Sequence, residues 1–500
     1  MPELTVDGIK VAVPAGATLL EAARRAGREV PTLCHREGLR SWASCFLCQV
    51  EVADRDRFLP ACATPAEEGM VVRTDTEALH AARRRALELL LSDHRGECEA
   101  PCRTACPARL DIRGMNDLLA AGREVEARRL VEESLALAGV IGRICPAYCR
   151  RACRRARLDR PLAIDRLHAA PPPCPPPARG ELRGKAAVVG AGPAGLAAAF
   201  HLARAGAAVT LFEARSLAGG EIRAQVPPDR LPRRVLEEEI DYILRTGCEF
   251  QGGRELGRDL RLEELLEGWG AVLLATGAGT EALPERCRRA LAGADRESGA
   301  TPLPGLFAAG EALARTGRAA VRAVASGYRA AAAMAARLAG REHVPPAKPC
   351  LVTLGRTTPE EEAILLRGPV AGAKEEPESI DPRVEADLCL RCGCAAEEDC
   401  RLRELATAYG ASPRRYRGER RPLEIDDSHP RVCFEPGKCI QCAICVRLSD
   451  PEDDYAGMIM TGRGFPLRVG PPFDRTLAEA LGDRAEECVR ACPTGALYFK

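Results

Sequence analysis

The sequence contains no segment that would tie the protein to a membrane or to nucleic acid. No apolar run reaches 18 residues, roughly the length that a membrane-spanning helix needs. The first residues, MPELTVDGIKVAV, lack the charged start and apolar core of a secretory signal. Positive and negative side chains nearly balance, with a formal net charge of +1, so no basic surface is indicated. We therefore expect a cytoplasmic protein with no membrane span and no nucleic-acid partner.

Cysteine, in contrast, is abundant, with 24 in 500 residues. In a reduced compartment, clustered cysteines are more often metal ligands than disulfide partners. Eighteen of the cysteines fall into groups with ligand-like spacing. The other six are Cys174, Cys248, Cys287, Cys350, Cys433 and Cys488. No Ser-His-Asp or paired-carboxylate pattern is present, so the sequence assigns no catalytic residue.

The first group follows a predicted β-hairpin at residues 3–13 and a helix at 19–27. It consists of Cys34, Cys45, Cys48 and Cys62. A structural zinc site needs two compact pairs and only one C-x2-C pair exists, so the spacing favours a [2Fe–2S] cluster. The segments CHREGL, SCFLCQVEV and PACATP resemble the N-terminal domain of the large peripheral subunit of respiratory complex I, and of related hydrogenase and formate dehydrogenase subunits. The resemblance implies a carrier of single electrons.

The complex I resemblance continues through LELLLSDHRGEC. In complex I the matching helix ends in a histidine that ligates a [4Fe–4S] cluster just before its first cysteine. The spacing of His94 and Cys98 fits that arrangement. Complex I then continues C-x2-C-x5-C, whereas this chain continues C-x3-C-x3-C-P.

A second group of six cysteines lies in a helical segment at residues 97–170. The segments CPARLDIRGMNDLLAAGREVEARRL and GRICPAYCRRAC resemble the N-terminal domain of the glutamate synthase small subunit and of dihydropyrimidine dehydrogenase. The resemblance implies two [4Fe–4S] clusters. One would use Cys98, Cys102 and Cys153, and the other Cys106, Cys145 and Cys149.

Each of these clusters needs a fourth ligand. The family's leading cysteine is absent here, and His94 is the candidate that replaces it. In the second cluster the family uses a side chain at a position that falls on His168, in LAIDRLH. Imidazole in place of thiolate would raise the potential of a cluster. The alternatives are a solvated His94 at a helix end and a His168 that belongs to a linker.

A βαβ unit begins at Lys185 with KAAVVGAGPAGLAAAF, which places three glycines between a buried-type strand and a helix. Such glycines allow the tight turn, the approach of a pyrophosphate and close helix packing, while Glu213 after the next strand suits a ribose hydroxyl. The helix N-terminus favours phosphate. GGEIRAQVPPDRLPRRVLEEEI, LLATGA and PGLFAAGEALARTGRAAVRAVASGYRAAAAMAARL resemble the FAD-contacting segments of the glutamate synthase small subunit. The resemblance implies FAD, contacted by Gly190, Gly192, Pro193, Ala194, Gly195, Glu213, Gly220, Arg230, Thr276, Gly277, Gly310 and Glu311.

The family has Asp where Glu311 stands, and it has an NADPH domain after LLATGA. Here only residues 278–300 separate the two flavin segments. One βαβ unit needs about 30 residues, so the NADPH domain is absent. The flavin would then exchange electrons with the clusters, a partner subunit or an unknown small molecule. The alternative is a flavin domain that is kept only as a scaffold.

Two more groups lie near the C-terminus. Cys439, Cys442 and Cys445 read C-x2-C-x2-C as in bacterial ferredoxins, and Cys492, before a proline, would complete a [4Fe–4S] cluster and leave Cys488 unused. The second group lies just upstream and could hold an iron–sulfur cluster or a structural zinc. The other cluster sites predicted in the same chain favour an iron–sulfur cluster. The second group consists of Cys389, Cys392, Cys394 and Cys400.

The sequence thus predicts a multidomain α/β and α+β protein in seven parts. These are residues 1–78, a β-grasp [2Fe–2S] domain; 79–170, an α-helical domain with two [4Fe–4S] clusters; 171–184, a Pro-rich linker; 185–340, a Rossmann-like FAD-binding domain without the NADPH insertion; 341–382, a second linker; 383–425, a Cys-rich cluster segment; and 426–500, a ferredoxin-like [4Fe–4S] domain.

We expect an electron-transfer subunit of a multi-subunit oxidoreductase, with FAD, one [2Fe–2S] and three to four [4Fe–4S] clusters. Its partners would be catalytic and electron-carrier subunits such as a hydrogenase, a formate dehydrogenase or an NAD(P)H-oxidising flavoprotein. One alternative is a stand-alone NAD(P)H-dependent oxidoreductase like the glutamate synthase small subunit. The other is a structural or assembly subunit with a vestigial flavin domain.

Overall fold

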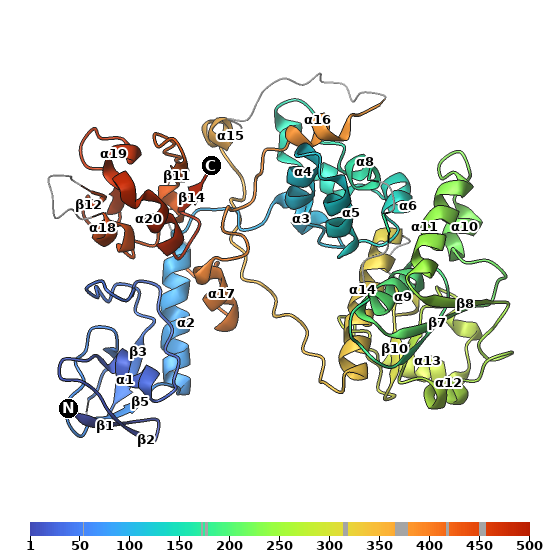
Figure 1. The fold of residues 1–500 in the computed structure, drawn as a ribbon, viewed down its shortest axis with the longest axis horizontal. Helices are drawn as coiled ribbons and strands as arrows, with labels where there is room; N and C mark the ends of the chain where they lie inside the picture. The colour runs from blue at the N-terminus through green and yellow to red at the C-terminus, as the bar shows by residue number, and fades with distance from the viewer. Residues whose placement is uncertain are drawn as a thin grey trace. The chain divides into compact units, whose positions relative to one another are not determined.

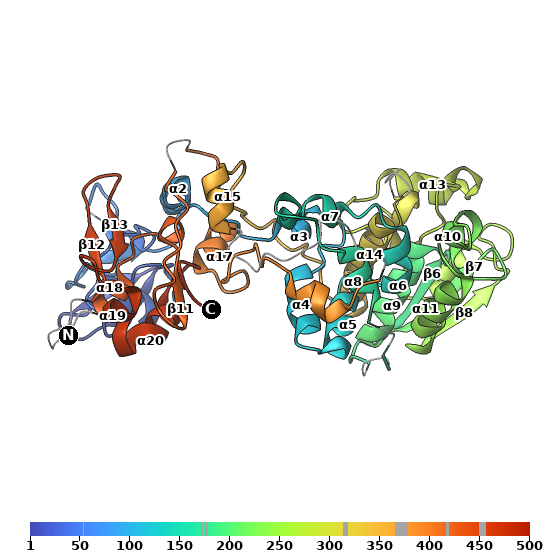
Figure 2. The same ribbon diagram turned by 90° about the horizontal axis from the view of Figure 1, so that it is seen from above.

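The computed structural model describes residues 1–53, 55–171, 174–175, 179–313, 319–365, 379–416, 420–449 and 457–500. Parts of both predicted linkers, and of the predicted FAD segment after Glu311, lie outside these residues. The chain forms two compact units. Unit 1 comprises Met1–Glu99, Ala347–Arg367 and Cys392–Lys500, and unit 2 comprises Ala100–Pro346 and Gly368–Arg391. Both ends of the chain therefore belong to unit 1 (Figures 1 and 2).

Unit 1 begins with a five-stranded mixed sheet. Its strands are β1 (Glu3–Val6), β2 (Ile9–Ala12), β3 (Gln49–Val52), β4 (Leu59–Pro60) and β5 (Val71–Arg73), in the order β2-β1-β5-β3-β4. Strands β1 and β5 are parallel, and the other pairs are antiparallel. Helix α1 (Leu19–Arg25) starts at a capping box of Thr18 and Glu21 and buries Leu19 and Leu20.

Helix α2 (Glu77–Ser92) connects this sheet to the cysteine-rich part of unit 1. It begins at Thr76, whose hydroxyl accepts a hydrogen bond from the Leu79 amide at 3.2 Å. Leu87 and Leu91 of α2 share a buried core with Leu402 and Leu405 of helix α17 (Arg401–Ala408). The end of α2 is thereby held beside the start of α17.

In its described residues, the C-terminal part of unit 1 contains two small two-stranded sheets and three α-helices. Strand β11 (Val432–Phe434) pairs with β14 (Leu497–Phe499), and β12 (Ile459–Thr461) pairs with β13 (Arg468–Gly470), both antiparallel. The helices are α18 (Ile444–Leu448), α19 (Leu477–Leu481) and α20 (Ala485–Ala491); helix α15 (Pro359–Leu365) also belongs to unit 1.

Unit 2 contains a helical part and a parallel sheet. The helices are α3 (Pro101–Ala105), α4 (Ile112–Ala120), α5 (Glu124–Glu132), α6 (Ala138–Ile144), α7 (Tyr148–Arg151), α8 (Ile164–Ala169) and α16 (Pro382–Asp387). The sheet has the order β10-β9-β6-β7-β8 and every neighbouring pair is parallel. Its strands are β6 (Lys185–Val189), β7 (Ala208–Glu213), β8 (Cys248–Gly252), β9 (Ala271–Leu274) and β10 (Leu306–Ala308).

Helices cover both faces of this sheet, as expected for buried parallel strands. Ala186 and Val188 of β6 face helices α9 (Pro193–Ala205) and α14 (Ala320–Leu338). Ala187 and Val189 face the opposite core, with helices α12 (Leu262–Gly268) and α13 (Glu285–Ala292). Helices α10 (Gly220–Gln225) and α11 (Arg233–Arg245) complete this part.

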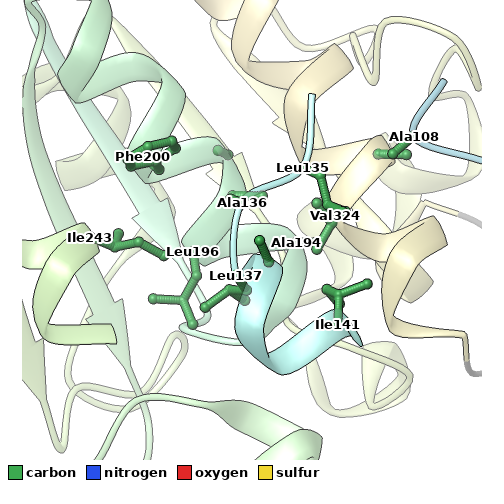
Figure 3. Packing of buried hydrophobic residues seen from close by; sticks show 14 of the residues in the cluster. Ala108, Leu135, Ala136, Leu137, Ile141, Ala194, Leu196, Phe200, Ile243 and Val324 are labelled. Carbon is green, nitrogen blue, oxygen red and sulfur yellow. The ribbon is translucent and has the colours of Figure 1, made fainter. Parts of the chain in front are cut away.

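The helical part of unit 2 is anchored to the sheet part by a buried ionic network. The Arg128 guanidinium lies 2.6 Å from Glu132 and 3.0 Å from Glu239 of α11. Glu239 also accepts the Gly139 amide at 3.0 Å, at the start of α6. Because an unpaired charge would be costly here, the network fixes α6 against α11. Figure 3 shows the adjoining core, where Leu137 and Ile141 pack against α9 and α14.

None of the helices in the described ranges is long and apolar enough to cross a membrane.

Candidate metal centres and dinucleotide site

The four cysteines of the first group come together in unit 1. Cys34, Cys45, Cys48 and Cys62 are 1% to 4% exposed. Contacts with the Cys45 and Cys62 side chains lower the pKa of Cys34. A contact with the Cys62 side chain likewise lowers the pKa of Cys48. Four converging thiols without a second C-x2-C pair fit a [2Fe–2S] cluster.

The C-terminal group also converges. A cavity is lined by Cys439, Cys442, Cys445, Cys488 and Cys492. Burial, and then the charge of Cys492, raises the pKa of Cys442, so Cys492 lies beside the C-x2-C-x2-C loop as predicted. The Cys488 thiol instead donates to the Cys445 carbonyl at 3.9 Å. The arrangement fits one [4Fe–4S] cluster.

Arg447 joins the two sites of unit 1. One guanidinium nitrogen, Nη2, donates to the carbonyl of Cys34 at 2.8 Å and to the carbonyl of Cys442 at 3.2 Å. Cys34, Cys45 and Cys442 belong to one buried cluster of side chains. The loop that contains Cys34 and the loop that contains Cys442 are therefore direct neighbours.

In unit 2 the structure groups Cys106, Cys145 and Cys149, as the resemblance implies. Burial is the main cause of the raised pKa of Cys149, followed by the charges of Cys106 and Cys145. The charge of Asp165 also acts on Cys145 and Cys149, although sequence reasoning missed this residue. Asp165 forms an ion pair with Arg150 at 3.2 Å.

His168, the predicted fourth ligand of this group, is buried on helix α8. Its Nδ1 has no hydrogen-bond partner, and burial lowers its pKa to about 4. The charges that act on it include those of Arg128 and Glu239, from the buried network. Its role as a ligand stays a prediction.

Cys389 lies in unit 2, apart from the cysteines with which its spacing groups it. Helix α16, just before it, is fixed in unit 2 because Arg160 donates to Glu385 at 2.7 and 2.5 Å. Arg155 also donates to the Leu388 carbonyl at 2.8 Å. This docking brings Cys389 close enough for its charge to raise the pKa of Cys153, after the larger effect of burial. Helix α3, with Cys102, contacts helix α7, which ends just before Cys153.

Cys394 and Cys400 lie elsewhere, in unit 1. They line a small cavity with His94 and Cys98. Burial raises the pKa of Cys98 to about 12, and the charges of Cys394 and Cys400 add to this effect. Two predicted groupings are thus corrected: Cys98 lies with Cys394 and Cys400, and the C-x2-C-x-C-x5-C run does not form one site. The reason is that the chain crosses between the units at residues 99/100 and 391/392.

The cysteine loops share an unusual backbone. Non-glycine residues with left-handed φ follow the first or second cysteine of several groups, at a conformational cost that such loops bear at functional sites. They are Phe46 (54°), Ala147 (53°), Arg391 (47°), Gln441 (56°) and Ala443 (54°). The turn points amides at sulfur: Gln441 donates to Cys439 Sγ at 3.3 Å, and Ala147 donates to Cys145 Sγ at 3.4 Å. Such bonds tune cluster potentials.

The glycine turn of unit 2 has the geometry of a dinucleotide site. Gly190 has a φ of 108°, and a Cβ there would lie 2.4 Å from the Ala275 carbonyl oxygen. A Cβ at Gly195 would lie 1.8 Å from the Gly190 oxygen. At Gly192 the nearest heavy atom would be Gly220 Cα at 4.0 Å, so open space remains where a pyrophosphate approaches. Helix α9 starts directly after it at Pro193.

Other predicted flavin contacts surround this turn. Glu213 is buried and accepts the Ala191 amide at 2.7 Å, which orients it at the end of β7. The Thr276 hydroxyl is buried without a hydrogen-bond partner, as expected for a group that awaits a ligand. Gly310 donates to Ser326 Oγ at 3.0 Å and leads to Glu311. Arg230 instead reaches the Arg143 carbonyl at 3.5 Å. These residues fit a dinucleotide such as FAD.

The chain between strands β9 and β10 is short. Residues 275–305 are fully described and contain a 3-10 turn (Thr280–Ala282), helix α13 and no strand. A second βαβ domain does not occur in this part of the chain.

Within the described residues, no three His, Cys, Asp or Glu side chains close on a single metal ion. The ligands of an iron–sulfur cluster sit around a larger body, so their sulfur atoms are spread more widely than around one ion.

Three models of known domain families match parts of the chain. Residues 2–77 match the 2Fe-2S iron-sulfur cluster binding domain. Residues 73–170 match domain II of dihydropyrimidine dehydrogenase, a 4Fe-4S cluster domain, and residues 188–246 match an NAD(P)-binding Rossmann-like domain. The chain is thus a multidomain mixed α/β protein that contains a 2Fe–2S domain, a 4Fe–4S domain and a Rossmann-like domain.

Three relatives share about a third of the chain. NADPH-Fe(3+) oxidoreductase subunit beta of Geobacter sulfurreducens is 38% identical over 36% of this chain and 28% of its own length. NADP(+)-dependent formate dehydrogenase subunit beta of Moorella thermoacetica is 36% identical over 36% and 29%. NAD-dependent dihydropyrimidine dehydrogenase subunit PreT of Salmonella typhimurium is 35% identical over 36% and 46%. The chain thus spans less than half the length of these relatives.

Among solved structures, NAD+-reducing [NiFe]-hydrogenase in the H2-reduced state aligns with 100% of this chain and 87% of its own at 14% identity. The TM-score is 0.36, too low to support an inference.

Proposed function

We propose that the chain is an electron-transfer subunit of a multi-subunit oxidoreductase. FAD, one [2Fe–2S] and three to four [4Fe–4S] clusters would relay electrons to or from a catalytic partner. Formate dehydrogenase and NAD(P)H-oxidising subunits are candidate partners, since two relatives are named as formate dehydrogenase and NADPH-Fe(3+) oxidoreductase subunits. A hydrogenase is the third candidate, because the first cysteine group resembles that of hydrogenase subunits.

The core that helix α6 shares with the start of helix α9 supports this proposal most strongly. Helix α6 ends at Ile144, directly before Cys145, and its Ile141 shares a core with Ala194, at the start of α9 (Figure 3). Beyond α6, Arg322 of α14 lies 5.4 Å from the ring centroid of Tyr148, between Cys145 and Cys149. A cofactor at the glycine turn and a cluster at Cys145 would therefore be neighbours.

The residues of the chain would hold and insulate these groups. The helix α9 N-terminus and Gly192 would bind the pyrophosphate of FAD, and Glu213 would bind a ribose hydroxyl. Glu311 would take the place of the family's aspartate at the ribityl chain. When bound, FAD can accept two electrons at once and pass them on one at a time. The finer architecture we propose is a β-grasp first domain and a ferredoxin-like last domain.

Anaerobic purification of the full chain with its native partners tests this function. We expect FAD, iron and sulfide in the chain, together with a catalytic subunit that co-purifies. Iron without FAD would instead favour the structural or assembly subunit. Bleaching of the flavin of the isolated chain by NADPH would favour the stand-alone oxidoreductase. The short segment 275–305 argues against that alternative, because it has no room for an NADPH domain.

A further inference from the structure

We propose that His94, Cys98, Cys394 and Cys400 bind one [4Fe–4S] cluster in unit 1. The ligands lie on two chain segments almost 300 positions apart. The proposal rests on the proposed iron–sulfur function and assigns a site that neither the spacing nor the relatives define.

The first support is the cavity itself. It is lined by His94 and Cys98, which follow helix α2, and by Cys394 and Cys400, which precede helix α17. The core shared by α2 and α17 holds the two segments together, because Leu91 and Leu402 are both buried in it. The site therefore depends on packing, not on a chance approach of loops.

The second support is a pair of buried polar atoms that make no hydrogen bond. Nδ1 of His94 and Nη1 of Arg403 are both buried without a hydrogen bond. Both residues line the cavity, and Arg403 also forms a long ion pair with Glu99, at 3.9 Å from Nη1. Buried polar atoms are nearly always satisfied in folded proteins. An imidazole ligand and a cation beside an anionic cluster account for both exceptions.

The third support is the fit of the backbone around the sulfurs. The Val352 amide donates to Cys98 Sγ at 3.3 Å, and the Cys98 amide donates back to the Val352 carbonyl at 3.0 Å. Gly495 lies against the sulfur of Cys394, since a Cβ at Gly495 would be 2.3 Å from that atom. An amide donor to thiolate and a glycine at close approach are typical of a cluster loop.

The fourth support is charge. Lys438 is 5% exposed, lines the cavity and is paired with Glu435 at 2.7 Å. Its charge interacts with Cys98 and Cys394. Several thiolates in one buried place need such compensation.

The remaining cysteine of the C-terminal run supports the same division independently. Cys389 is held in unit 2 by helix α16, and Cys102, Cys153 and Cys389 all pack against the same buried core. It thereby supplies a thiolate to the group of Cys102 and Cys153, which loses Cys98 to the new site. Residues 100–391, apart from the stretch 347–367, thus form a module inserted between the ligands of one cluster.

Paired cysteine variants of the anaerobic full chain test the assignment. Cys98→Ser and Cys394→Ser should each lose about four iron atoms and the same reduced-cluster signal in electron paramagnetic resonance, while Cys389→Ser loses a different signal. Cys350→Ser, a buried cysteine beside the site and outside every group, is the matched control and should lose nothing. The [2Fe–2S] signal reports that each variant has folded.

Two other outcomes would overturn the assignment. In the first, Cys394→Ser and Cys389→Ser would each lose the same signal, and Cys98→Ser would lose a different one. That result would restore the grouping of cysteines by their spacing in the sequence. An unchanged spectrum in Cys394→Ser would leave no cluster at this site. If the wild-type chain holds no iron, the proposed function fails as well, so the two failures can be told apart.

His94→Cys separates a ligand from a structural histidine and does not depend on losing the cluster. We expect full iron, with a signal shifted in shape and a lower midpoint potential, because thiolate replaces imidazole. An unchanged potential would contradict His94 as a ligand.

Discussion

Arg160 and Glu385 are 225 positions apart, yet the guanidinium donates to both carboxylate oxygens, at 2.7 and 2.5 Å. The side chains are 10% and 4% exposed. Glu385 also accepts the Ala163 amide at 2.9 Å. This pair holds the returning segment of the chain in unit 2 and thereby places Cys389 beside Cys153.

Removing one partner of the pair should destabilise unit 2. Glu385→Ala removes the buried carboxylate that both guanidinium nitrogens of Arg160 bind, and breaking such a buried pair costs about 3–5 kcal/mol. Urea unfolding of the anaerobic chain, followed by circular dichroism, should show a lower midpoint and loss of the cluster signal that Cys389→Ser also removes. The control is Glu263→Ala, whose exposed ion pair with Arg286 should matter little. An unchanged midpoint in Glu385→Ala would show that the pair does not hold the segment.

Gly192→Ala should remove the flavin and spare the fold. The site of the new Cβ is open in the protein alone, with Gly220 Cα 4.0 Å away, so the methyl group would occupy space meant for the pyrophosphate. We expect FAD affinity to fall by about tenfold or more, which corresponds to about 1.4 kcal/mol. FAD released per chain on heating measures this, with iron as the check on folding.

Gly268→Ala is the matched control for that substitution, because its Cβ would also enter open space, with nothing within 4 Å, and it is far along the chain from the turn. Equal FAD content in Gly192→Ala and Gly268→Ala would argue against a dinucleotide at this turn.

Gly495→Ala should disturb the His94 site selectively. The new Cβ would lie 2.3 Å from Cys394 Sγ and 3.3 Å from Ala396 Cβ, so the sulfur must move. We expect loss of the signal assigned to Cys394, while the C-terminal cluster signal persists. Gly470→Ala, with nothing within 4 Å, should change neither. If Gly495→Ala kept every signal, the packing of Gly495 on that ligand would be wrong.

NADPH should not reduce the flavin of the isolated chain. Residues 275–305 hold no strand that could begin a second nucleotide-binding domain. Anaerobic mixing with NADPH should leave the flavin absorbance unchanged within minutes, whereas dithionite should bleach it. Rapid bleaching by NADPH would mean that a nicotinamide site exists on this chain after all.

The sequence predicted the sites whose ligands lie close together or match a known pattern. The loop of Cys34, the ferredoxin-like loop with Cys492 and the glycine turn at Gly190 all lie where spacing places them. Their signals are local, since a few residues decide the turn and the direction of the side chains.

The division of the remaining cysteines could not be predicted in this way. Cys98 and Cys102 are four positions apart and Cys389 and Cys394 five, yet each pair is split between two units. The split depends on the packing of α2 against α17 and of α16 against the helical part of unit 2, which no spacing records. One feature of the sequence does point to the observed grouping. Cys394 and Cys400 have the C-x5-C spacing that ends the complex I pattern, and His94 and Cys98 have the spacing that begins it.

A reductive titration of the anaerobically purified full chain, followed by electron paramagnetic resonance with iron, sulfide and FAD analysis, tests the relay most directly. We predict one [2Fe–2S] signal, at least three distinct [4Fe–4S] signals and about one FAD per chain. Zinc at the cysteine sites, or metal-free protein without reduced-cluster signals, would contradict the relay as a whole.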